Sequence, residues 1–89
     1  MYARQTKIIN EVGLHARPAS IFVLKAKEFS SDITIKRVGE GLGYNAKSIM
    51  KLMIAALVKN TEVELTADGV DEVAAVDTLV ALIESGCGE

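Results

Sequence analysis

The segment Gly13–Ser20 holds the residues best suited to chemistry, including His15, the one histidine of the chain. Pro18 suits the first turn of a helix, where the N–H that proline lacks would have no helical partner. His15 would then lie just before the helix, beside the unpaired backbone N–H groups of Ala16 and Arg17. Such a helix start binds anions, and the guanidinium of Arg17 can hold a phosphate with two hydrogen bonds. An imidazole beside an anion site is suited to reversible phosphorylation on nitrogen.

The run Gly-Leu-His-Ala-Arg-Pro-Ala in this segment resembles the active-site signature of the histidine-containing phosphocarrier (HPr) family of the bacterial phosphotransferase system. A second segment, Asn45–Met50, resembles the regulatory serine motif of that family. The two motifs lie at roughly the family's separation, and the likeness covers nearly the whole chain.

The resemblance implies a phosphocarrier. Enzyme I, charged by phosphoenolpyruvate, would phosphorylate His15 on Nδ1, and the group would pass to enzyme IIA components of sugar permeases. The chain would supply positioning and charge compensation, through Arg17 and the N–H groups of Ala16 and Arg17. It would act as a co-substrate rather than as an independent enzyme, and no cofactor is expected.

The second motif is expected to provide a surface for partner proteins. A short helix cannot bury every side, so some of its apolar side chains should form an exposed patch beside His15, where methionine adapts to its contacts. The residues predicted to contact partners are Ala16, Ser20, Lys47, Ile49, Met50, Lys51 and Met53.

Ser48 has two interpretations. A serine at this place suits the N-cap of a helix and needs no regulatory role to explain it. The resemblance implies in addition that Ser48 is a regulatory phosphorylation site, with a Ser/Thr kinase/phosphorylase and a transcriptional regulator as further partners.

Charge is distributed unevenly along the chain. Residues 1–59 contain all ten Lys and Arg residues and four acids, a net charge of +6, whereas residues 60–89 contain eight acids and no base. Both motifs lie in the basic part, which would attract an acidic partner surface. Nucleic acid is not an expected partner, because there is no basic cluster and no aromatic interleaving.

Composition favours a single domain over residues 1–89 with an aliphatic core, since 49% of the residues are hydrophobic but only 4% are aromatic. The apolar runs are too short to span a bilayer and the N-terminus lacks the apolar region of a secretion signal, so we expect a cytoplasmic protein. Metal sites and catalytic triads are not expected, because there is no second histidine and Cys87 is alone between two glycines.

Hydrophobic spacing predicts seven elements in the order βαββαβα. The expected strands are 2–9, 32–37, one that begins at 42–46 after the turn glycines of 39–43, and 62–66. The expected helices are 16–29, a short one capped by Ser48 that reaches Ala56, and a long one capped by Asp71 that Gly86 ends. This order is typical of an α+β open-faced sandwich, a four-stranded antiparallel sheet with three helices on one face. The resemblance implies the same fold.

The sequence departs from the family pattern at three places. Val12 replaces the usual Ser, Thr or Asn, and thus removes a hydrogen bond that would help to hold the phosphorylated loop. Lys51 stands where glycine is common, which adds bulk and charge beside the expected kinase docking site. The hairpin at 39–43 is about two residues longer than usual.

Two alternatives to a sugar phosphocarrier follow from the same residues. One is a carrier for a nitrogen-related or regulatory branch that feeds no sugar. The other is a regulatory binding protein that docks to transcription factors or other targets through Ser48, although related regulators replace the histidine that His15 provides here. An inert α+β interaction domain would leave the segment around His15 unexplained.

Overall fold

The computed structural model describes residues 1–88 and contains the predicted order of elements. The strands are β1 (Tyr2–Lys7), β2 (Asp32–Arg37), β3 (Tyr44–Asn45) and β4 (Glu62–Asp68). The helices are α1 (Arg17–Ala26), α2 (Ile49–Ala55) and α3 (Glu72–Glu84). The predicted α+β class and the order βαββαβα are confirmed.

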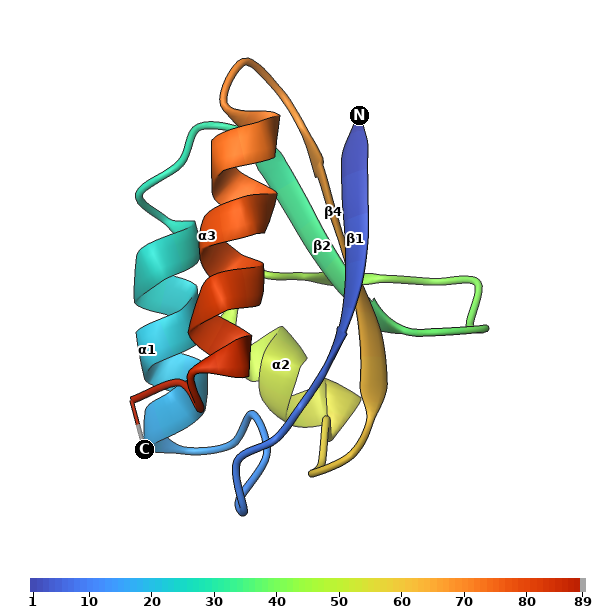
Figure 1. Ribbon diagram of the computed structural model, residues 1–89, viewed down its shortest axis with the longest axis vertical. Helices are drawn as coiled ribbons and strands as arrows, with labels where there is room; N and C mark the ends of the chain where they lie inside the picture. Colours follow the sequence, from blue (N-terminus) through green and yellow to red (C-terminus); the bar gives the residue numbers. More distant parts are fainter. Residues whose placement is uncertain (89) are drawn as a thin grey trace.

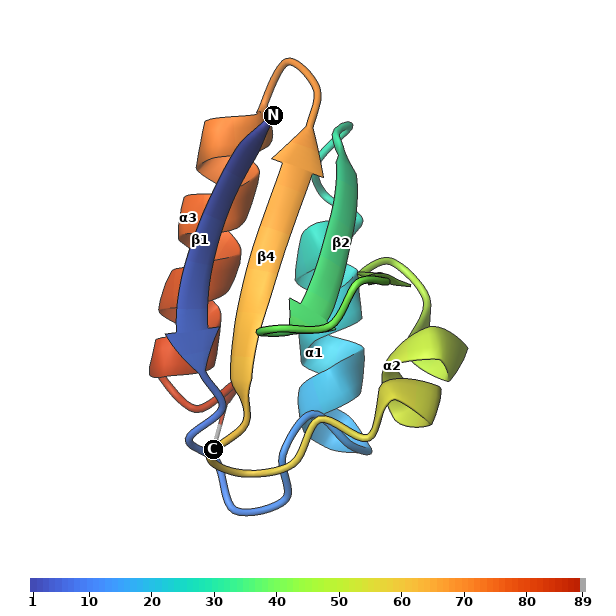
Figure 2. The same ribbon diagram turned by 90° about the vertical axis from the view of Figure 1, so that its right-hand side faces the viewer.

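The four strands form one antiparallel sheet in the order β1-β4-β2-β3. Strand β4 therefore lies between β1 and β2 and pairs with both. Helices α1 and α3 lie side by side along one face of this sheet, and α2 lies near the lower end of α1 (Figure 1). Figure 2 shows β1, β4 and β2 in front of these two helices, with the opposite face uncovered. This is the predicted open-faced sandwich.

The core between sheet and helices is aliphatic, as the composition indicates. Alternate residues of β2 and β4 point into it, and both central strands show a period of two in their burial. Helix α1 buries Ala19, Phe22, Val23 and Ala26, the spacing that predicted a helix. Each fully buried Leu, Ile or Phe contributes roughly 1.5–3 kcal/mol through the hydrophobic effect. No helix among residues 1–88 has both the length and the apolarity needed to cross a membrane.

Several element boundaries differ from those predicted. The first strand ends at Lys7 and the first helix at Ala26, before the ends predicted at residues 9 and 29, and β4 extends to Asp68. Strand β3 contains only two residues, because its pairing with β2 stops after Ile35. Leu42 is therefore outside the strand, 84% exposed in the long hairpin that projects from the sheet (Figure 1).

The segment after α3 folds back onto the protein. The N–H of Cys87 donates to the carbonyl oxygen of Leu82, and the Cys87 side chain is fully buried in the core. A Cβ atom added to Gly88 would lie 2.8 Å from Ile21 Cδ1 of α1. The sequence placed Cys87 in a tail, and its burial shows that this tail is part of the packed structure.

Asp71 is the N-cap residue of α3, but its side chain does not cap that helix. The carboxylate instead accepts hydrogen bonds from the backbone N–H of Ser30 at 2.8 Å and of Ser31 at 3.0 Å, and from the Ser31 hydroxyl. These hydrogen bonds, that of the Ser31 hydroxyl first, lower the pKa of Asp71 to about 2. Asp71 thus joins the start of α3 to the loop between α1 and β2.

We predict that Asp71→Asn lowers the melting temperature at pH 7. Because the pKa in the folded state is about 2, below the ordinary value of 3.8, the stabilisation by the charged form is complete above pH 3.8. This stabilisation is lost as the pH falls from 3.8 towards 2. The difference in melting temperature between wild type and variant, measured by thermal unfolding with circular dichroism, should therefore become smaller in this pH range. Asp32→Asn is the control, since Asp32 is exposed. An equal change in both variants would contradict the prediction.

Candidate functional site

The loop that carries His15 is attached to the segment between α2 and β4. The N–H of Leu14 donates to the carbonyl oxygen of Leu57 at 2.8 Å, and Ile8 exchanges backbone hydrogen bonds with Asn60 and Thr61 nearby. Leu14 is itself buried. These contacts bring together two loops about 45 residues apart in sequence, seen at the bottom of Figure 2.

Gly13 is needed for this contact. Its φ of +68° is in the left-handed region, and an added Cβ would lie 2.3 Å from the carbonyl oxygen of Leu57. The Asn10 side chain donates to the carbonyl oxygen of Gly13, which fixes the loop from within. A side chain at position 13 would therefore separate the loop from Leu57.

His15 lies at the surface immediately before α1, as the sequence predicts. Ala16 is the N-cap residue, Arg17 begins the helix, and Pro18 is in its first turn. Within residues 1–88, neither the His15 ring nor the Arg17 guanidinium makes a hydrogen bond or ion pair, and the N–H groups of Ala16 and Arg17 have no backbone partner. Both side chains and both donors are thus available to an anion at the start of α1.

Ala16 has an unusual backbone conformation, with φ 56° and ψ −123°. A residue other than glycine in such a region costs of order 1–3 kcal/mol, and such residues concentrate at functional sites. The carbonyl oxygen of Ala16 accepts from the N–H of Ser20, so the first helical turn holds this conformation. The sequence contains no sign of it, because alanine is ordinary in a helix and its φ is set by the loop.

Beside His15 is an apolar hollow of about 370 Å³. Its walls come from the His15 loop, the end of α2 and the segment that follows α2. It is lined by Val12, Leu14, His15, Met53, Ala56, Leu57 and Val58. Val12, one of the departures from the family pattern, is 51% exposed and forms part of this apolar wall.

Helix α2 places most of the predicted partner residues at the surface. It buries Leu52 and Ala55 and leaves Met50 72% and Met53 43% exposed. Ile49 is 38% exposed, at the margin of the patch. Two exposed residues that sequence reasoning missed, Ile54 and Val58, extend the apolar surface, and the helical spacing from Met50 and Met53 was a signal for Ile54.

The polar residues predicted near the patch differ in their exposure and in their hydrogen bonds. Ser48 is the N-cap as predicted, and its hydroxyl accepts from the N–H of Lys51 at 3.2 Å. The Lys51 side chain is exposed. Lys47, predicted to contact partners, is only partly exposed, and its ammonium donates to the carbonyl oxygen of Phe29 at 2.7 Å. Ser20 is half-buried on the first turn of α1.

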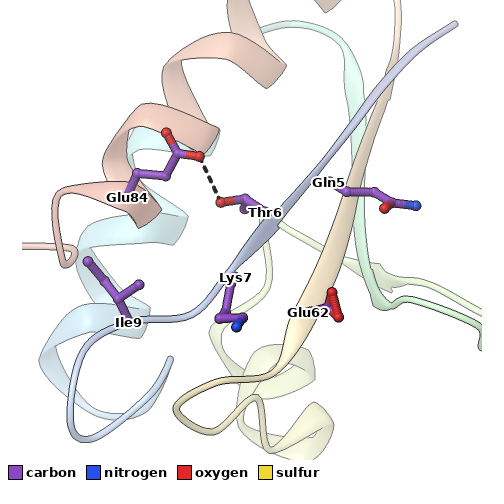
Figure 3. A pocket seen from close by; sticks show the side chains of 6 residues that line it. All are labelled: Gln5, Thr6, Lys7, Ile9, Glu62 and Glu84. Atoms are coloured by element: carbon purple, nitrogen blue, oxygen red, sulfur yellow. Dashed lines mark hydrogen bonds between the residues drawn. The ribbon is translucent and has the colours of Figure 1, made fainter.

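A second hollow, of about 380 Å³, lies at the C-terminal end of β1. It is lined by Gln5, Thr6, Lys7, Ile9, Glu62 and Glu84, and the Thr6 hydroxyl donates to Glu84 across it (Figure 3). Lys7 and Glu62 lie on the other side of the strand from Glu84. Among residues 1–88, no group of three or more His, Cys, Asp or Glu side chains is arranged to hold a metal ion. At the start of α1, by contrast, the exposed His15 and Arg17 lie beside backbone N–H groups that have no backbone partner.

Comparison with known proteins identifies the family of the chain. Residues 2–85 match the family model described as "PTS HPr component phosphorylation site". Phosphocarrier protein HPr of Haemophilus influenzae is 48% identical over 83 residues, which cover 93% of this chain and 95% of that protein. HPr-like protein Crh of Bacillus subtilis is 40% identical over 84 residues, which cover 94% and 96%.

A solved structure shows the same architecture. The crystal structure of HPr-C-His from Thermoanaerobacter tengcongensis superposes with a TM-score of 0.93 at 44% identity, covering 100% of this chain and 98% of that one. The fold, the family model and the full-length relatives therefore agree, and the chain belongs to the HPr family of phosphotransferase-system phosphocarriers.

Proposed function

We propose that this protein is a cytoplasmic phosphocarrier, which accepts a phosphoryl group on His15 from phospho-enzyme I and donates it to enzyme IIA components of sugar permeases. The observation that carries the proposal is the exposed imidazole of His15 next to the guanidinium of Arg17 and the unpaired N–H groups of Ala16 and Arg17. The imidazole can react with a phosphoryl group, and the guanidinium and the N–H groups can bind its oxygens. The combination favours phosphoryl transfer as the function of this segment.

Transfer to His15 needs a neutral imidazole with its proton on Nε2. The Nδ1 lone pair attacks phosphorus, a new N–P bond forms, and the bond between phosphorus and the phosphorylated residue of enzyme I breaks and returns its electron pair to that residue. Charge on the transferred group is balanced by Arg17 and the backbone donors, and positioned groups of this kind contribute most in the transition state. In the transfer to enzyme IIA, His15 is the leaving group: a nucleophile of enzyme IIA attacks phosphorus, the Nδ1–P bond breaks, and its electron pair returns to Nδ1.

Docking is proposed on the apolar surface of α2 and the hollow beside it. Ile49, Met50 and Met53 offer apolar area close to His15, and Lys51 adds an exposed positive charge. Such a surface suits a partner with an apolar groove and an acidic rim, for which charge sets the association rate. Lys47 contributes less directly, because its ammonium is bound to Phe29.

A second candidate function is regulation through Ser48. The observation that favours it is the 40% identity to relatives named HPr-like protein Crh, together with Ser48 at the start of the exposed helix. A Ser/Thr kinase/phosphorylase and a transcriptional regulator would then be partners. Carriage and regulation are compatible, since they use different side chains of one surface.

His15→Ala should abolish phosphorylation by phosphoenolpyruvate and a cognate enzyme I. The wild-type adduct should be labile in acid and stable in base, as a phosphoramidate is, and mass spectrometry should detect one added phosphoryl group. Circular dichroism should show the same fold for both proteins, because the His15 ring has no partner within residues 1–88. An adduct that persists in His15→Ala would refute the assignment.

Arg17→Ala should slow phosphorylation while the free energy of unfolding changes by less than about 0.5 kcal/mol, because the side chain is exposed and makes no hydrogen bond or ion pair within residues 1–88. Arg17→Lys should recover part of the rate, since an ammonium supplies charge without two parallel hydrogen bonds. The control is Arg4→Ala, which removes an exposed arginine paired with Asp77 on α3. Full rates in both Arg17 variants would show that the backbone donors suffice.

Ser48→Asp should lower the rate at which enzyme I phosphorylates His15 and leave the melting temperature equal or higher. Aspartate keeps the N-cap and is favoured by the helix dipole, but its charge lies in the docking surface and repels an acidic partner. Ser48→Asn keeps the cap without the charge and should retain the wild-type rate. If Ser48→Asp also retains that rate, Ser48 acts only as a helix cap.

A further inference from the structure

Arg37, the last residue of β2, makes contacts that the phosphocarrier motifs do not include. One of its guanidinium nitrogens, Nη2, donates to the carbonyl oxygens of Ala55 at 2.6 Å and Ala56 at 2.8 Å. The other, Nη1, lies 3.8 Å from Glu40 in the hairpin. Arg37 therefore connects the sheet to the end of α2, a distance of 18 and 19 residues in sequence.

The end of α2 needs such a partner. The helix has only seven residues and no basic residue in its last turn, so its terminal carbonyl groups lack a local counter-charge. Its C-cap is Ala56, with φ 52° and ψ 54°, a left-handed conformation that glycine adopts more readily than alanine. The guanidinium supplies a positive charge and donors to the carbonyl groups of the two peptide units that flank Ala56.

This turn leads directly to the His15 loop. Ala56 lines the hollow beside His15, and the next residue, Leu57, accepts the hydrogen bond from Leu14. A shift in the turn would move the Leu57 carbonyl group and, with it, the segment that holds His15. Arg37 itself lines no part of the hollow.

We infer that Arg37 is a positioning residue for phosphoryl transfer, which fixes the left-handed turn after α2 and so sets the place of the His15 loop against the docking helix. The effect of Arg37 on phosphoryl transfer rests on the proposed function, whereas its effect on the turn after α2 does not. Alanine at position 56 makes the chain depend on Arg37, and glycine at that position should reduce the dependence.

The test compares Arg37→Met, Arg37→Lys, Ala56→Gly and the double variant Arg37→Met/Ala56→Gly. The control is Arg4→Met, which also removes an arginine that joins a strand to a helix, but at α3. Amide hydrogen exchange by NMR follows Leu14 and Ala56, whose N–H groups bind Leu57 and Met53, with Leu65 in the centre of β4 as the reference. Phosphorylation by enzyme I is measured on the same proteins.

Arg37→Met should accelerate exchange at Leu14 and Ala56 about tenfold relative to Leu65, and Arg37→Lys should do so less. Adding Ala56→Gly should restore most of the protection and of the phosphorylation rate, and Arg4→Met should change neither. Unchanged exchange in Arg37→Met, an equal increase at Leu65, or no recovery in the double variant would each overturn the inference. Wild-type protein that takes no phosphate would refute the proposed function, while the exchange pattern would still decide the role of Arg37.

Discussion

The hydrogen bond between Leu14 and Leu57 is the contact on which the site depends. It joins the loop before α1 to the segment after α2, and it exists only because Gly13 lets the two backbones approach. On one side of this contact lie His15 and the start of α1, and on the other side lies α2 with its exposed apolar side chains. Without it, His15 and Met53 would belong to separate surfaces of the molecule, although both line one hollow here.

Much of the fold could be predicted from local patterns. Alternate residues are buried in β2 and β4, and the buried residues of α1 follow a helical spacing, because each element has one buried face. Such patterns are present in any compact structure. The start of α2 was predicted because a serine hydroxyl readily accepts a hydrogen bond from a helix N–H. His15 and Arg17 were identified as candidate site residues because their types and spacing suit phosphate chemistry. The predictable features were therefore those that depend on residues close to one another in the sequence.

The features that sequence reasoning missed come from distant partners. Asp71 looks like an ordinary helix cap, and only the folded chain brings it to Ser30 and Ser31, about 40 residues earlier. Arg37 and Lys47 also have distant backbone partners, since Arg37 donates to carbonyl groups at the end of α2 and Lys47 donates to that of Phe29 in the loop after α1. The strained φ of Ala16 likewise follows from how the loop is anchored, not from the residue itself.

The central place of β4 has a consequence for the order of synthesis. Strand β1 pairs with β4, residues 62–68, and so has no partner strand while the chain is still being made. The carbonyl group that anchors the His15 loop also comes late, at Leu57. A nascent chain on the ribosome thus exposes the complete phosphorylation motif long before it can hold that motif in shape, because such distant contacts form only when their later members have emerged. An unfinished chain would therefore lack the contacts that order the His15 loop.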